Sequence, residues 1–217
     1  MKKVMNVGVL GCGYWGPLLV RNFAYHPNCK LNTVCDLEVK RLTHLQGLYP
    51  DVKFQRDAEA FLSDPAIDAV AIATPVRLHY EMAKTALENG KHVLIEKPMA
   101  ASSAECEELI ELADRKGLIL MVDHTFLYSS PVRKIVEIIQ AGDIGDIRYI
   151  NSRRLNLGLF QKDINVAWDL APHDISIILH ILEEFPTMVN CSGNAHVTPH
   201  VEDVTNMSLS FRHKRFA

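Results

Sequence analysis

Short apolar runs alternate with amphipathic stretches over the first 122 residues of the chain. Most of the runs are rich in Val, Ile or Leu, which is typical of strands buried on both faces of a sheet. We predict strands at residues 4–10, 31–35, 52–54, 69–73, 92–95 and 118–122.

The amphipathic stretches predict a helix after most of these strands, at residues 14–24, 37–48, 77–89 and 102–116. The last begins with Ser102 and Glu105 at capping-box spacing, and Gly117 follows it as a stop signal. This alternation predicts an α/β domain over residues 1–122, with a doubly wound parallel sheet and right-handed crossovers.

The pattern changes after residue 123. A helix at 131–140, a long strand at 147–157, a helix at 172–182 and β-like segments at 188–197 and 204–211 predict a second, α+β domain over residues 123–217. We expect an open, mostly antiparallel sheet there. The last seven residues resemble a turn toward a further strand, so we expect the sheet to be incomplete and the chain to be truncated.

Composition excludes several classes of protein. The chain has 217 residues, 48% hydrophobic and 23% charged, which are globular values. The net charge of −3 and the lack of a basic block give no support for a nucleic-acid partner. No apolar run is long enough for a transmembrane helix. The odd cysteine count of five, with no C-x-x-C pair, favours a reduced, cytoplasmic location.

A glycine-rich turn follows the first predicted strand. Gly11, Gly13 and Gly16 match G-x-G-x-x-G, and Tyr14 and Trp15 lie between the last two glycines. The first glycine permits a sharp turn, the second lets a pyrophosphate approach the backbone, and the third lets helix and strand pack closely. The strand before and the helix after meet the context required for dinucleotide binding; an ordinary tight turn is the alternative.

Asp36 ends the next predicted strand, 20 residues after Gly16. A carboxylate at this position accepts hydrogen bonds from the adenosine ribose and repels a 2′-phosphate, which favours NAD over NADP. Lys40 and Arg41 follow and would offset that repulsion. We interpret them as a solvated helix face.

Three further motifs complete a resemblance. Ala73-Thr74-Pro75 ends one predicted strand, with His79 shortly after, and Glu96-Lys97-Pro98 ends the next. Residues 168–174, Trp-Asp-Leu-Ala-Pro-His-Asp, open the late helix. With the glycine turn, the whole chain resembles the Gfo/Idh/MocA family of NAD(P)-dependent oxidoreductases. Segments 13–17, 122–126 and 156–160 resemble its WlbA-like, nucleotide-sugar branch.

The resemblance implies hydride transfer between a hydroxyl carbon of a sugar or nucleotide sugar and NAD(P), in a homo-oligomer when the chain is full length. It implies that the Lys97–Pro98 bond is cis and that Thr74, Pro75 and His79 line the nicotinamide side, with Glu96 and Lys97 beside them. A lone histidine such as His79 is otherwise typical of a helix surface.

Oxidation of an alcohol requires a base and groups that hold the substrate in line. Lys97 follows a strand at the sheet edge where ligands bind, and His173 has a pKa range suited to proton transfer. Asp169 shares a face with His173 if both are helical, but Pro172 suits a first helical turn and would leave Asp169 outside. The alternative for Asp169 is a capping carboxylate, and the alternative for His173 is a buried structural histidine. For Asp174 a capping role is favoured.

Other polar residues carry weaker signals. Arg153 and Arg154 would meet a substrate phosphate or carboxylate, or form a solvated strand face. His196 and His200 have no third ligand at a suitable spacing, so we expect no metal site. The competing hypothesis for the whole chain is a non-catalytic NAD(P)-binding protein, either a sensor or a truncated pseudoenzyme.

Overall fold

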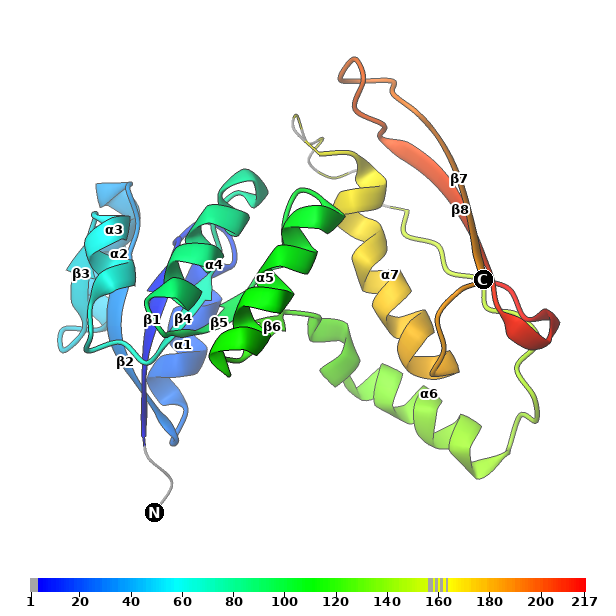
Figure 1. Cartoon of the computed structure of the whole chain (residues 1–217), viewed down its shortest axis with the longest axis horizontal. Helices are drawn as coiled ribbons and strands as arrows, with labels where there is room; N and C mark the ends of the chain where they lie inside the picture. Colours follow the sequence, from blue (N-terminus) through cyan, green and yellow to red (C-terminus); the bar gives the residue numbers. More distant parts are fainter. Residues whose placement is uncertain (1–3, 156–157, 159, 161, 163) are drawn as a thin grey trace. The chain divides into compact units, whose positions relative to one another are not determined.

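The computed structural model describes all residues except 1–3, 156–157, 159, 161 and 163. Its contacts divide the chain into two compact units, residues 1–123 and 124–217, which Figure 1 shows in blue to green and in green to red. The first unit contains strands β1 Met5–Leu10, β2 Cys29–Cys35, β3 Lys53–Gln55, β4 Ala69–Ile72, β5 His92–Ile95 and β6 Leu120–Val122. Its helices are α1 Gly16–Tyr25, α2 Val39–Leu48, α3 Ala58–Ser63, η1 Val76–Leu78, α4 His79–Glu88 and α5 Ser103–Lys116.

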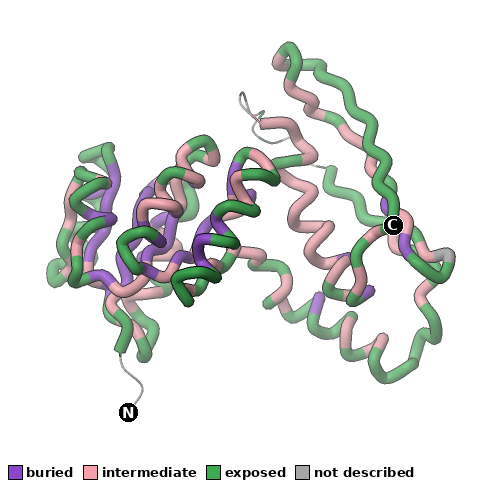
Figure 2. Tube along the Cα trace, viewed as in Figure 1, coloured by how far each residue is buried: buried purple, intermediate pink, exposed green. Residues whose placement is uncertain are grey.

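The six strands form one parallel sheet in the order β3-β2-β1-β4-β5-β6. Successive residues of a strand point to opposite faces, and both faces are apolar here. Val9 of β1 packs in a core with α1 and α2, whereas Leu10 packs in a second core with α3, α4 and α5. Figure 2 accordingly shows buried backbone along the central strands. The predicted doubly wound parallel sheet is confirmed, and its strand order is that of the Rossmann fold.

The sequence reading missed helix α3 because it spans only residues Ala58–Ser63, too few to show a clear period. A local signal was present, since the Asp57 side chain caps the helix by accepting a hydrogen bond from the Ala60 N–H (3.0 Å). A tertiary contact holds it in place. Phe61 is fully buried, and its ring occupies the space where a Cβ on Gly8 would lie.

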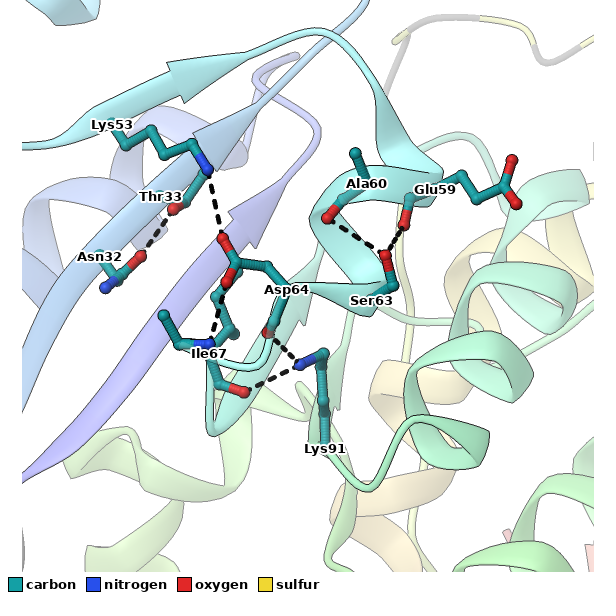
Figure 3. A network of polar contacts seen from close by, with 10 residues as sticks. Asn32, Thr33, Lys53, Glu59, Ala60, Ser63, Asp64, Ile67 and Lys91 are labelled. Atoms are coloured by element: carbon teal, nitrogen blue, oxygen red, sulfur yellow. Dashed lines mark hydrogen bonds and ion pairs between the residues drawn. The ribbon is translucent and has the colours of Figure 1, made fainter.

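A polar network fastens the amino edge of the sheet (Figure 3). Lys91, just before β5, is 2% exposed and donates from Nζ to the main-chain oxygens of Asp64 (2.6 Å) and Ile67 (2.9 Å). The Asp64 carboxylate accepts from Lys53 Nζ (3.2 Å). Burial lowers the pKa of Lys91, which the nearby acidic charges partly oppose. A buried lysine is tolerated only with such partners, so this network is structural and lies at the edge opposite the strand ends where ligands bind.

The second unit contains η2 Thr125–Tyr128, α6 Ser130–Ala141, α7 Val166–Leu182, β7 Met188–Asn194, β8 Val204–Ser210 and η3 Arg212–Lys214. β7 and β8 form an antiparallel pair, and Ile178 and Leu182 of α7 pack against Leu209 and Phe211. The segment after the η3 turn returns along β8, where Leu209 and Ala217 exchange main-chain hydrogen bonds (2.7 and 2.9 Å).

Two predictions for this unit were wrong. The long strand at 147–157 is absent from its described residues, where only Tyr149 forms a bridge, with Phe216. An alternating pattern makes a strand only where a neighbour completes the hydrogen-bond ladder. Helix α7 begins at Val166 instead of Pro172, because Asn165 caps it by accepting a hydrogen bond from the Trp168 N–H (2.9 Å).

No helix in the described part of the chain is both long and apolar enough to cross a membrane.

Candidate active site

The glycine turn connects β1 to α1 at the carboxyl edge of the sheet. Gly11 has φ +95°, and a Cβ there would lie 2.6 Å from the Ala73 oxygen. A Cβ on Gly16 would lie 2.0 Å from the Gly11 oxygen, so helix and turn are in direct contact. A Cβ on Gly13, in contrast, would meet no atom within 4 Å. Two of the glycines therefore serve packing, and the third leaves open space beside the backbone.

Tyr14 and Trp15 project from this turn into solvent, with exposed fractions of 84% and 48%. Their rings meet edge to face, with centroids 5.1 Å apart. The Trp15 oxygen accepts the first hydrogen bonds of α1, from the Leu18 and Leu19 N–H groups. Trp15 is thus an exposed fluorescent side chain at the N-terminus of α1.

Asp36 lies beside the turn, immediately after β2, and is 7% exposed. Its Oδ2 accepts from the Cys12 N–H (2.6 Å) and its Oδ1 from the Glu38 N–H (2.7 Å). Arg41 Nη1 lies 3.4 Å from Oδ2, so Arg41 is paired with Asp36 although its side chain is 52% exposed. This corrects the interpretation of Arg41 as a simply solvated residue.

The turns after β4, β5 and β6 meet at the same edge, because Ile72, Ile95 and Val122 are in register. Thr74 and Pro75 follow β4, and Glu96 and Lys97 follow β5. The Lys97–Pro98 bond is cis, as the resemblance implied. Burial raises the pKa of Glu96 to about 7, with a further contribution from the negative charge of Asp123 after β6. A carboxyl that titrates near neutrality therefore lies next to Lys97.

His79 begins α4 and is 1% exposed, so it is not the surface residue that its position on a helix suggested. Its Nε2 lies 2.8 Å from the Thr74 oxygen and its Nδ1 lies 2.9 Å from the Pro98 oxygen. His79 therefore contacts the turns after both β4 and β5.

Asp169 and His173 lie in the second unit, both within α7. Their i, i+4 spacing in a continuous helix places them on one face, which decides between the two arrangements that the sequence left open. The His173 ring packs edge to face against Phe126 of η2, with centroids 4.8 Å apart. An aromatic neighbour of this kind limits the orientations of the imidazole.

Asp174 lies in the interior of α7 and is not the capping residue predicted. Its carboxylate accepts from Arg154 Nε (2.8 Å), from Arg154 Nη2 (3.3 Å) and from Ser152 Oγ (2.6 Å). Arg154 also stacks over the Phe126 ring, 5.1 Å from its centroid. The network fastens residues 152–154 and η2 to the helix that carries His173. Burial raises the pKa of Asp174, but the Arg154 and Ser152 interactions outweigh it and hold the pKa below its ordinary value.

Replacing Asp174 by Asn is expected to destabilise the second unit by about 1–2 kcal/mol near neutral pH, because Arg154 loses its charged acceptor. A lowered pKa stabilises the fold above the unfolded-state value of about 3.9. The difference between wild type and variant should therefore be constant from about pH 5 to 7 and shrink as the pH falls below about 4. Urea unfolding at several pH values measures it.

The control is Asp146→Asn, which removes a pair with Arg148 that is more than 80% exposed on both sides. It should leave stability almost unchanged. Equal effects of the two substitutions would contradict a special role for the Arg154–Asp174 pair.

Two buried polar side-chain atoms at the carboxyl edge need an explanation, one on the predicted site residue Thr74 and one on Gln55, which the sequence analysis did not single out. Among the described residues, Thr74 Oγ1 and Gln55 Nε2 are buried with no hydrogen-bond partner. Thr74 follows β4, and Gln55 ends β3 beside Asp36, whose N–H donates to the Gln55 oxygen (3.3 Å). Buried unsatisfied groups are rare, so these two atoms call for a partner from outside the protein, such as a water molecule or a ligand. The described part of the chain contains no group of three or more potential metal ligands.

Comparison with known families identifies this arrangement. Residues 5–124 match the model described as "Oxidoreductase family, NAD-binding Rossmann fold", and residues 132–217 match the GFO/IDH/MocA C-terminal domain. The chain belongs to the GFO/IDH/MocA oxidoreductase family. Its first unit is therefore an NAD-binding Rossmann domain, and the glycine turn, Asp36 and the strand ends of this GFO/IDH/MocA chain lie on the edge where such domains bind ligands.

Individual relatives act on polyols and nucleotide sugars. The scyllo-inositol 2-dehydrogenase (NADP(+)) IolW of Bacillus subtilis is 32% identical over 82% of this chain and 51% of its own length. The UDP-N-acetylglucosamine 3-dehydrogenase of Acidithiobacillus ferrooxidans is 29% identical over 93% of this chain and 62% of its own length. The chain thus spans between half and two thirds of these relatives.

Among solved structures, the scyllo-inositol dehydrogenase of Lactobacillus casei with bound NAD(H) and scyllo-inositol superimposes with a TM-score of 0.80. It covers 99% of this chain and 68% of its own, at 19% identity, and so supports the fold.

Proposed function

We infer that this chain belongs to an NAD-dependent dehydrogenase that transfers a hydride between the hydroxyl-bearing carbon of a sugar or nucleotide sugar and the cofactor. The observation that carries the proposal is the carboxyl edge of the Rossmann sheet. There an open glycine turn, the buried carboxylate of Asp36 and the strand-end residue Lys97 occur together.

The residues at this edge fit a dinucleotide. Gly13 leaves room for a pyrophosphate at the N-terminus of α1, where the free N–H groups and the helix dipole favour negative charge. Asp36 retains acceptor capacity for a ribose hydroxyl, since each carboxylate oxygen accepts more than one hydrogen bond. The orphaned Thr74 Oγ1 offers a polar contact at the nicotinamide side. Tyr14, Trp15 and Pro75 flank the same edge.

When bound, NAD supplies the ring that accepts the hydride, and the protein supplies geometry and proton transfer. In this proposal Lys97 binds and orients the reacting hydroxyl from its position after β5. His173 takes the proton that the hydroxyl loses. Asp169, one helical turn before His173, holds the imidazole or a neighbouring substrate hydroxyl. Glu96 accepts a hydrogen bond from the Lys97 N–H and so fixes the local turn.

The proposed substrate class rests on the relatives. Their names include an inositol and a UDP-linked amino sugar, which supports a polyhydroxylated ring as the substrate. The WlbA-like branch, which acts on nucleotide sugars, is the narrower proposal, and the UDP-N-acetylglucosamine relative supports it. The second unit, residues 124–217, is proposed to bind this substrate and to contribute to a homo-oligomer.

Titration with NADH and NADPH, followed by the fluorescence of the two tryptophans, Trp15 and Trp168, tests cofactor binding. We expect saturable NADH binding and weaker NADPH binding, because the Asp36 carboxylate repels a 2′-phosphate. In Asp36→Asn the Kd for NADH is expected to rise about 10- to 100-fold, the value of a hydrogen bond to a charged group, while NADPH binding improves.

The exposed carboxylate Asp51 provides the control, since Asp51→Asn should change neither affinity. A preference that survives in Asp36→Asn would contradict the role of Asp36. No response of the folded protein to either cofactor would overturn the proposed function. NAD reduction with inositols and UDP-sugars, followed by NADH absorbance, then identifies the substrate.

A further inference from the structure

His79 is the most completely buried histidine in the described part of the chain, and the proposed reaction gives it no chemical step. It lies between two main-chain oxygens, those of Thr74 (2.8 Å) and Pro98 (2.9 Å). Thr74 belongs to the turn proposed to face the nicotinamide, and Pro98 directly follows Lys97. The side chain of His79 thus connects the turn after β4 to the turn after β5.

The contacts restrict what the ring can do. A neutral imidazole has one N–H and donates to one carbonyl, whereas the protonated ring donates to both. Burial, together with the positive charge of Lys97, lowers the pKa of His79 despite the two carbonyls. Whether neutral or protonated, the imidazole ring occupies the space between the two turns and sets their separation. A buried ring with both nitrogens engaged is poorly placed to exchange a proton with a substrate.

We propose that His79 is a positioning residue that holds the Lys97–Pro98 turn and the Thr74–Pro75 turn at a fixed separation through their main-chain carbonyls. The inference rests on the proposed function, because it gives His79 a task only if a nicotinamide and a substrate hydroxyl meet at these turns. In this inference the residues that touch the cofactor are carried by the two turns. His79 is buried behind the turns and contacts their main chain.

The two nitrogens of His79 are tested separately by two amide side chains. The amide nitrogen of Asn lies near the position of Nδ1 and that of Gln near Nε2, so His79→Asn keeps a donor for Pro98 and His79→Gln keeps one for Thr74. His79→Leu keeps neither. Loss of one hydrogen bond corresponds to about a 3- to 10-fold effect.

Each variant is titrated with NADH and with ADP-ribose, the cofactor fragment without nicotinamide, and its turnover is measured. We expect unchanged ADP-ribose affinity throughout, since that fragment reaches only the glycine turn and Asp36. NADH affinity should fall in His79→Asn, and kcat should fall more than NADH affinity in His79→Gln. His79→Leu should show both losses. His92→Gln is the matched control, because His92 bonds the Ile119 N–H at the opposite edge of the sheet (3.0 Å).

Parallel loss of ADP-ribose and NADH affinity, or a lower melting temperature with unchanged kinetics and NADH affinity, would assign His79 a merely structural role and overturn the inference. If the wild-type protein binds neither NADH nor ADP-ribose, both this inference and the proposed function are overturned. If the wild-type protein binds both ligands and the variants behave as wild type, only the inference is overturned.

Discussion

Replacing Lys97 by Met is expected to reduce kcat by about 10²- to 10⁴-fold, the range of a positioned acid–base group. Met keeps the length and apolar stem of the side chain but loses the ammonium that would orient the reacting hydroxyl. The kcat of His173→Ala is expected to be reduced by a factor in the same range, because this substitution removes the proposed base. If both residues serve one proton transfer, the double variant should lose little more than the worse single variant.

NADH affinity separates this effect from misfolding. It should remain close to that of wild type in Lys97→Met, because the glycine turn and Asp36 hold most of the cofactor. Lys116→Met is a suitable control, since that lysine donates to the Glu88 oxygen (2.9 Å) at the surface. Multiplicative losses in the double variant would show that Lys97 and His173 act in independent steps. Wild-type NADH binding without turnover on any sugar tested would leave the non-catalytic hypothesis.

Gly16→Ala is expected to abolish NADH binding and to destabilise the first unit by about 1–3 kcal/mol or more, the cost of overpacking. Its Cβ would lie 2.0 Å from the Gly11 oxygen, so the helix has to move away from the turn. Backbone atoms cannot rotate out of the way as a side chain can. Thermal unfolding and NADH titration of the same sample measure the two losses together.

Gly13→Ala is the matched comparison, three residues earlier in the same motif. No atom lies within 4 Å of its Cβ, so stability should be unchanged or rise by about 0.4–1 kcal/mol as the unfolded chain becomes less flexible. NADH affinity should nevertheless fall about tenfold or more, because the methyl group fills the space left for the pyrophosphate. Unchanged NADH affinity in Gly13→Ala would contradict the binding site, whereas a normal melting temperature in Gly16→Ala would contradict the packing contact.

Local sequence patterns were sufficient to predict most of the structure of the first unit. The glycine spacing and the acid at residue 36 indicated the dinucleotide site, and the box of Ser102 and Glu105 is present as predicted, with the Glu105 N–H donating to Ser102 Oγ (3.3 Å). These signals act over a few residues, so they can be read along the chain. The start of α7 was predicted incorrectly because two residues, Asn165 and Pro172, both resemble helix start signals. The helix begins after Asn165 and continues through Pro172.

The sequence by itself determined the Rossmann architecture, the family and the residues proposed for chemistry, because periodicity and motif spacing are properties of the chain. Only the tertiary structure decided that Lys91 is buried, that Arg154 pairs with Asp174, and that His79 lies between two turns. Each depends on at least one contact between groups 19 to 27 residues apart, which folding brings together. A polar residue on a helix or strand looks the same in the sequence whether its partner is water or a distant carbonyl, and packing makes that choice.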